Sequence, residues 1–466
     1  MKKSFVALAV LGAFAGTSMA AEVTMYGVVD TGLLYQHGEA SASIDGIGST
    51  NAEVDSFSME TGTNSASRFG IRGTEDLGND MTVGFKLENG FESDTGALKT
   101  DSKLFDREST LFIKGGFGTV YAGRMGTLVS DAGSVGFYGS MASALATGWS
   151  DNIAGHNAVM ANYSSRYDNT IAYVSPEFAG VTIYAQYAMG DTNENKASND
   201  RYAALGAEWK AGALDLAALV DWTNKDSSIT HSNGAEFQAD MNLQDAWTFN
   251  LAGSYDFGFM KTYLATQYFK DARDAGSVLD YVGFFDEDSV FNNNEGDVKF
   301  NKGAVANTGY GVHLSTAFDV LGGTMKAGIG YMDADIDYAN DGQVADSKVY
   351  TAAFGYEYSL SKRTLVYTGL GYTKRELDAN YEGVTGSWEE EGYDFALRLA
   401  PTPSAASSSR LTTPAPRRIL LRAFCFFGAG RQGRHAQASR KQCLRTEKSP
   451  KRTPLGASLM TTGLPW

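Results

Sequence analysis

Apolar and polar residues alternate with a period of two along most of this chain of 466 residues. In the segment MTVGFKLENGFE, which begins at Met81, most odd-numbered positions are apolar and the even-numbered ones are small, polar or charged. The same alternation recurs in segments that begin at Val181, Tyr310 and Met325. Because successive side chains of a β-strand point to opposite faces, the pattern predicts strands with one apolar and one polar face.

The lengths of the links between these segments narrow the choice of fold. They alternate between short turns, such as AG at 211–212, and longer segments rich in Asn, Gly, Ser and acids. Outer-membrane barrels have tight turns at one end and long loops at the other, whereas a Greek-key sandwich has no reason to alternate. We predict an all-β fold, a transmembrane antiparallel up-and-down β-barrel of about 16 strands. The expected strands are residues 23–36, 65–74, 81–92, 104–115, 118–124, 160–174, 180–190, 201–210, 213–223, 246–257, 259–270, 308–319, 323–336, 347–358, 363–375 and 389–399.

The composition agrees with strands in a membrane. The chain has 53 Gly, 26 Phe and 24 Tyr, which favour strands and tight turns. Beyond the N-terminal leader, no window approaches the roughly 18 apolar residues that span a bilayer as a helix. A closed barrel leaves no strand edge unpaired in lipid, and a barrel of this size encloses water. The sequence therefore predicts a channel.

The N-terminus has the features of a secretory signal peptide. Lys2 and Lys3 precede an apolar run over residues 5–15, and the small residues of SMA at 18–20 offer a cleavage site. We expect residues 1–20 to be removed on export, which leaves the barrel at 21–399.

Residues 400–466 differ in composition from the rest of the chain. From Arg398 to Trp466 there are 13 Lys and Arg, one acid, seven of the eight prolines and both cysteines. No period of two runs through them, so we interpret this basic, Pro-rich tail as an out-of-frame read-through that is disordered. A linker to a basic domain is the alternative.

The charge of the body excludes one class of partner. Without the tail and the two leader lysines, 24 of the 39 basic residues remain against 53 of the 54 acids. Nucleic-acid binding needs clustered Lys and Arg, so we expect no nucleic-acid partner. We predict that the acids lie largely in external loops, such as the segments at 285–297 and 333–342.

Several motifs give the chain a resemblance to a known family. They are VTMYGVVDTGL, SASRFGIRGTEDLG, FDREST followed by GGFGTVYAGR, SSRYDNTIAYVSPEFAGVTIYAQYA, and YEYSLSKRTLVYTGLGY. As a set they resemble the Gram-negative general porins of the β-proteobacterial type over about Val23–Leu397. The resemblance implies a homotrimer in the cell outer membrane, in contact with lipid and lipopolysaccharide, that passes ions and small hydrophilic solutes by passive diffusion. It also implies an aromatic end to the last strand shortly after Leu399, where the tail stands instead.

The same resemblance implies where the channel narrows. The third external loop, about Met125–Val159, is expected to fold inward. The pore-constriction residues implied in this way are Arg68, Arg124, Arg166, Asp131 and Asp151, and the secondary lumen charges, which face inward by parity, are Arg72 and Lys86. Arg124 shares the parity of the outward-facing Val120, so either Gly123 supplies a bulge or the loop starts there.

Two other functions fit parts of the sequence. A substrate-specific channel would need an aromatic track for sugars, and Tyr26, Tyr121 and Tyr184 face inward by parity. A barrel enzyme would need a lipid-facing Ser and His on adjacent strands, and the sequence offers no such pair. The five histidines lack the spacing of a metal site, so we expect no metal and no cofactor. Net charge does not decide between anion and cation preference.

Overall fold

The computed structural model describes residues 22–400 except 47, 63, 146–154, 162, 191–200, 225–228, 231–235, 238–243, 273–304, 339–342 and 382–383. All of these residues belong to the first of two compact units, Met1–Ser408. No helix among them is both long enough and apolar enough to cross a bilayer. The leader, the tail, Asp151 and the acidic segment 285–297 lie outside the described residues, so what the sequence predicts for them stays a prediction.

Among the described residues, eighteen strands form one antiparallel sheet. They are β1 (Glu22–Val28), β2 (Thr31–Ile44), β3 (Gly48–Thr61), β4 (Arg68–Gly78), β5 (Met81–Gly90), β6 (Glu108–Gly115), β7 (Gly118–Gly126), β8 (Arg166–Val174), β9 (Val181–Ala188), β10 (Tyr202–Ala211), β11 (Leu214–Thr223), β14 (Ala246–Asp256), β15 (Met260–Ala272), β16 (Val305–Val320), β17 (Gly323–Tyr338), β18 (Gln343–Ser361), β19 (Thr364–Tyr381) and β20 (Val384–Ala400). The short strands β12 (Ile229–Thr230) and β13 (Glu236–Phe237) pair with each other.

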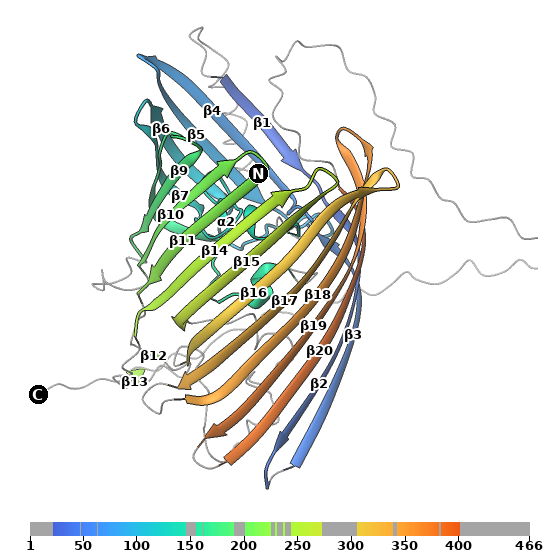
Figure 1. Ribbon diagram of the computed structural model, residues 1–466. Helices are drawn as coiled ribbons and strands as arrows, with labels where there is room; N and C mark the ends of the chain where they lie inside the picture. The colour runs from blue at the N-terminus through green and yellow to red at the C-terminus, as the bar shows by residue number, and fades with distance from the viewer. Residues whose placement is uncertain are drawn as a thin grey trace, which may run out of the picture. The chain divides into compact units, whose positions relative to one another are not determined.

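The pairing has the up-and-down order that the link lengths predict. From β4 to β20 each strand of the large sheet pairs with the next in the chain, β1 pairs with β4, and β20 pairs with β2, which pairs with β3 (Figure 1). The chain runs from β1 into β2 after two residues and from β3 into β4 after six. Counting each of these pairs as one interrupted strand turns the 18 strands into 16, which confirms the predicted architecture.

Asp30 occupies the interruption between β1 and β2, and it is fully buried. Its carboxylate accepts hydrogen bonds from the Ser65 N–H at 2.9 Å and from the Tyr367 hydroxyl of β19 at 2.8 Å. Its backbone carbonyl accepts one from the Gly62 N–H at 3.0 Å. Side-chain and turn hydrogen bonds therefore replace the strand ladder where the first two strands are interrupted.

The hydrogen-bond ladder of the sheet is not closed. β2 pairs with β20 as far as Thr31 opposite Leu399, but β1 pairs only with β4. Since β20 ends at Ala400, the second edge of β1 has no partner strand among the described residues.

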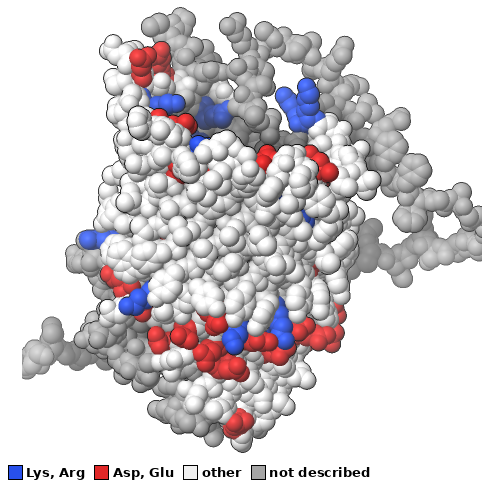
Figure 2. All heavy atoms as spheres, in the orientation of Figure 1, with Lys and Arg blue, Asp and Glu red and all other residues white. Residues whose placement is uncertain are grey.

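The two faces of the sheet have opposite character. In β14 the side chains of Trp247, Phe249 and Leu251 are 43%, 50% and 58% exposed, whereas the alternating Thr248 and Asn250 are buried on the inner face. Figure 2 shows the outer surface as a broad uncharged band with charged residues gathered beyond it at both ends. An apolar belt bounded by charge is the surface that a lipid-facing barrel requires.

Residues 125–161 are here called the inner segment, and the part of it that the structure describes, 125–145 and 155–161, folds against the inner face of the sheet. Its helix α2 (Tyr138–Ala142) packs on β11, β14 and β15, and the 3-10 turn η2 (His156–Val159) packs on β16, β17 and β18 (Figure 1). Small inward-facing wall residues such as Ala217 and Ala252 belong to the same buried cluster as α2. The third loop therefore folds inward, as predicted.

Gly311 of β16 allows η2 to approach the wall. A Cβ at this position would lie 1.8 Å from the backbone oxygen of Val159. We expect Gly311→Ala to displace η2 and lower the free energy of unfolding by about 2 kcal/mol. Thermal loss of the β-sheet circular-dichroism signal measures this, with Gly116→Ala as the control because no atom lies within 4 Å of a Cβ there. Equal midpoints for the two variants would contradict the expectation.

Two predictions about the long-loop end of the sheet were wrong. Residues 48–61 form β3, paired with β2 along its whole length, although the sequence predicted a loop there. Asp333 and its neighbours up to Tyr338 belong to β17 and not to an external loop. At this end of the sheet the outward positions include acids, such as Asp55 of β3 and Asp333 of β17, so an apolar outer face no longer marks the strands.

Candidate functional site

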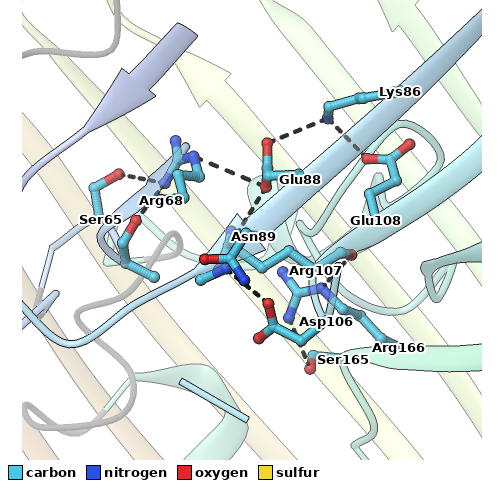
Figure 3. A network of polar contacts seen from close by, with 12 residues as sticks. Ser65, Arg68, Lys86, Glu88, Asn89, Asp106, Arg107, Glu108, Ser165 and Arg166 are labelled. Carbon is cyan, nitrogen blue, oxygen red and sulfur yellow. Dashed lines mark hydrogen bonds and ion pairs between the residues drawn. The ribbon is translucent and has the colours of Figure 1, made fainter. Parts of the chain in front are cut away.

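The inner face of β4 to β8 carries a row of charged side chains opposite the inner segment. Cross-strand pairing aligns them, since Arg72 lies opposite Lys86 and Glu88 lies opposite Glu108. Figure 3 shows how the side chains of this row converge. The row is here called the charged wall, and its members are Arg68, Arg72, Lys86, Glu88, Asp106, Arg107, Glu108, Arg124, Arg166 and Asp168.

Glu88 is the centre of the charged wall. Its carboxylate accepts hydrogen bonds from Arg107 Nε at 2.7 Å and from the Tyr26 hydroxyl at 2.7 Å. Lys86 Nζ lies 3.7 Å away and Arg68 Nε 3.9 Å away (Figure 3). Three cations and a phenol thus surround one carboxylate.

Glu108 joins the charged wall to the inner segment. Lys86 Nζ forms an ion pair with its carboxylate at 2.7 Å, and the Thr110 hydroxyl donates to it at 3.1 Å. The hydroxyl of Ser134, in the inner segment, donates to the same carboxylate. The side chain of Glu108 has no exposed surface. Its carboxylate therefore forms a buried link between Lys86 of the charged wall and Ser134 of the inner segment.

Arg124 and Arg166 extend the row to β7 and β8. Arg166 Nε donates to the backbone oxygen of Arg107 at 2.8 Å. Arg124 Nη1 lies 2.6 Å from a carboxylate oxygen of Asp168, which also pairs with Lys103 at 2.7 Å.

The expected bulge at Gly123 is not seen in the pairing of β7 with β6, which is regular through Gly123 and Arg124. The register of β7 against β8 shifts between Gly123 and Met125, with the extra residue on β8, and Gly123 has a φ of 132°. A Cβ at Gly123 would lie 2.1 Å from the backbone oxygen of Ser109, so only glycine fits. Arg124 stays opposite Ser109 of β6, and its Nε donates to the backbone oxygen of Asp106.

Of the two acids predicted to line the constriction, Asp131 and Asp151, the structure describes only Asp131. Asp131 lies on the described part of the segment and interacts electrostatically with Arg68. Asp151 lies outside the described residues. Of the secondary charges, Lys86 is part of the Glu88 network, and Arg72 lies with its Cζ 5.5 Å from the centre of the Tyr26 ring.

Sequence reasoning missed Glu88, Glu108 and Arg107 as members of the site. Parity had placed Glu88 on the same face as Lys86, and FDREST contains both Arg107 and Glu108. These residues could have been predicted from the occurrence of basic and acidic residues with inward parity on neighbouring strands.

Around Glu88 and Glu108 the cationic side chains of the charged wall are more exposed than the carboxylates. The side chains of Arg107, Arg68, Lys86 and Arg124 are 15%, 18%, 20% and 20% exposed, whereas Glu88 is 6% and Glu108 0% exposed. The exposed carboxylate of Asp168 lies between two cations. Water in the barrel therefore meets mainly guanidinium and ammonium groups.

His156 begins η2 of the inner segment, at the point where η2 meets the wall. Its ring is 6.4 Å from that of His313 and 5.6 Å from that of Tyr163, and neither of its nitrogens has a hydrogen-bond partner among the described residues. Burial lowers the pKa of the His156 imidazole to about 4. The imidazole of His156 is therefore neutral at pH 7 while η2 is docked against the wall.

One group of residues with metal-ligand chemistry occurs in the described part of the chain. His37, Glu53 and Asp55 have ligand atoms within 4.8 Å of one another, on the outer side of β2 and β3. Both ring nitrogens of His37 are already engaged, with Asp55 at 3.0 Å and Glu39 at 3.2 Å. The group lies outside the barrel and takes no part in the charged wall.

Comparisons with known proteins agree on one family. A family model described as Gram-negative porin matches residues 7–378. An outer membrane porin protein of Bordetella pertussis is 28% identical over 390 residues, covering 80% of this chain and 94% of that protein. Outer membrane porin protein 32 of Delftia acidovorans is 29% identical over 397 residues, covering 82% and 92%. Among solved structures, an anion-selective porin from Comamonas acidovorans matches with a TM-score of 0.54 and 23% identity, covering 82% of this chain and 100% of that one.

Proposed function

Because the chain belongs to the Gram-negative porin family, we propose that the charged wall and the inner segment form the waist of its pore and favour anions. The protein is an outer-membrane channel for the passive diffusion of small hydrophilic solutes, and it is not an enzyme. The proposal concerns the residues that select among those solutes.

The different exposure of the two signs of charge carries this proposal. Arg68, Arg107 and Lys86 keep part of their cationic side chains exposed, whereas the carboxylates they surround, Glu88 and Glu108, are buried. Fixed cations at a narrow point lower the energy of a passing anion and raise that of a cation. The similar porin from Comamonas acidovorans is anion-selective, which agrees with this preference.

The reversal potential of a lipid bilayer that separates two KCl concentrations tests the proposal. We expect the wild-type channel to pass chloride in preference to potassium. Arg68→Gln combined with Arg107→Gln should lower that preference by about fivefold or more, because Glu88 keeps its charge and loses two cations. Lys362→Gln, at the short turn between β18 and β19, is the matched control and should leave the ratio unchanged. A wild-type preference for potassium would refute the proposal.

The assembly and processing that the motifs imply also belong to this proposal. We propose a homotrimer in contact with lipid and lipopolysaccharide, a signal peptide at residues 1–20, and a tail at 400–466 that takes no part in the barrel. The exposed apolar belt supports the contact with lipid.

A further inference from the structure

We propose that the pore binds planar aromatic carboxylates between its waist and the short turns, with the ring on Phe112 and Tyr121 and the carboxylate toward Arg72 and Lys114. The inference rests on the proposed anion preference, since it names a class of anion that the channel retains.

Phe112 is an aromatic residue on the water-filled side of the barrel. It follows Glu108 and Thr110 on the inward face of β6, and its side chain is partly exposed. The ring lies against the backbone of β5, where a Cβ on Gly84 would lie 2.4 Å from Phe112 Cζ. The wall thus supports one face of the Phe112 ring. Phe112 does not belong to the buried cluster around α2.

Tyr121 extends this aromatic surface across to β7. It is the cross-strand partner of Phe112, and the two ring centres are 5.5 Å apart at an angle of 41°. Tyr121 and Tyr184 of β9 pack against the same buried cluster, and Phe137 of the inner segment stacks on Tyr184 at 4.1 Å. An incoming aromatic ring therefore meets a preformed surface of rings, which favours offset stacking.

Two cations near this surface lack a carboxylate partner. Arg72 and Lys114 are exposed, and no Asp or Glu of the described residues forms an ion pair with either. Lys114 follows Phe112 on the same face of β6, and Arg72 lies opposite Lys86 two strands away from Phe112. The cations of the Glu88 network, in contrast, share buried carboxylates.

The combination of rings and free cations favours one class of solute. A chloride ion would use the cations and gain nothing from the rings. A neutral sugar would use the rings and gain nothing from the cations. An aromatic carboxylate gains from both, because its ring is apolar and its charge lies at one end.

Block of the chloride current by added solutes tests the inference. Full-length protein in a lipid bilayer is titrated with benzoate, cyclohexanecarboxylate and benzamide, which separate the effect of the planar ring from that of the charge. We expect half-block by benzoate at about fivefold lower concentration than by cyclohexanecarboxylate, and weaker block by benzamide. Phe112→Leu should raise the benzoate value about fivefold and leave the cyclohexanecarboxylate value nearly unchanged.

Three further variants separate this site from general effects. Tyr121→Leu should act like Phe112→Leu, and Arg72→Gln with Lys114→Gln should weaken block by both carboxylates. Tyr263→Leu is the control, because this inward ring of β15 lies 5.3 Å from Lys261 Nζ, and Lys261 is already paired with Asp215. Conductance in KCl alone confirms that each variant has folded and inserted.

The outcomes distinguish this inference from the proposed function. If the channel prefers chloride but benzoate blocks it no better than cyclohexanecarboxylate, the aromatic site alone is refuted. The same holds if benzoate blocks Phe112→Leu and the wild type at the same concentration. A potassium-preferring channel refutes both.

Discussion

Replacing Pro401–Ser408 with a strand of alternating apolar and polar residues that ends the chain in Phe is expected to stabilise the barrel by about 5 kcal/mol or more. The register of β20 against β2, with Leu399 opposite Thr31, would carry the added residues along the free edge of β1. Pro401 and Pro403 fall in this stretch and have no N–H to donate. About seven new backbone hydrogen bonds, each contributing about 1 kcal/mol, would complete the ladder.

The temperature at which the folded form is lost on SDS gels measures this gain. Two controls separate the new strand from removal of the tail. One chain ends at Ala400, and the other carries the new strand with proline kept at positions 401 and 403. We expect both to unfold near the temperature of the full-length chain. If the chain that ends at Ala400 is as stable as the completed barrel, the free edge of β1 does not limit stability.

Acid is expected to release η2 from the wall and make the channel flicker between conductance levels. The imidazole of His156, freed from the wall, takes up a proton near its usual pKa of 6.5, whereas in the docked segment its pKa is about 4. The undocked state therefore binds more protons between these values, and docking weakens as the pH falls from 6.5 to 4. The loss amounts to about 3 kcal/mol and does not grow further below the docked pKa.

Single-channel recordings from pH 7 to pH 4 test this expectation. In His156→Phe, which keeps an aromatic ring and cannot take up a proton, the acid-dependent flicker should disappear. His37→Asn, which alters a partly buried histidine on the outer side of β2, should behave like the wild type. Acid flicker that persists unchanged in His156→Phe would show that another group controls it.

The sequence predicts the barrel well because lipid imposes a simple rule on the strands. Wherever the outer face meets lipid, as in β14, apolar residues recur at every second position, and this period identifies strand and face together. The rule fails for β3, whose outward positions include Glu53 and Asp55. A strand beyond the lipid is stabilised by pairing with its neighbour, which a single-strand pattern does not reveal.

The charged wall could be predicted only in part. Parity places Arg68 and Lys86 on the inner face from sequence alone, whereas the extra residue of β8 beside Arg124 has no sequence signal. The convergence of cations on Glu88 depends on cross-strand register and on side chains several residues long, and no local period encodes either. The position of His156 depends on how the inner segment folds back, which is a long-range contact without local signal.

The burial of Asp30 affects where the sheet opens when the protein is pulled or heated. At the interruption of the first two strands, one carboxylate links the turn at 62–65 to β19, across β2 and β20. Loss of the Asp30 hydrogen bonds would separate the elements they join in one step, whereas a regular strand ladder can lose its hydrogen bonds one at a time. Mechanical or thermal opening of this protein should therefore begin beside Asp30 and spread from there.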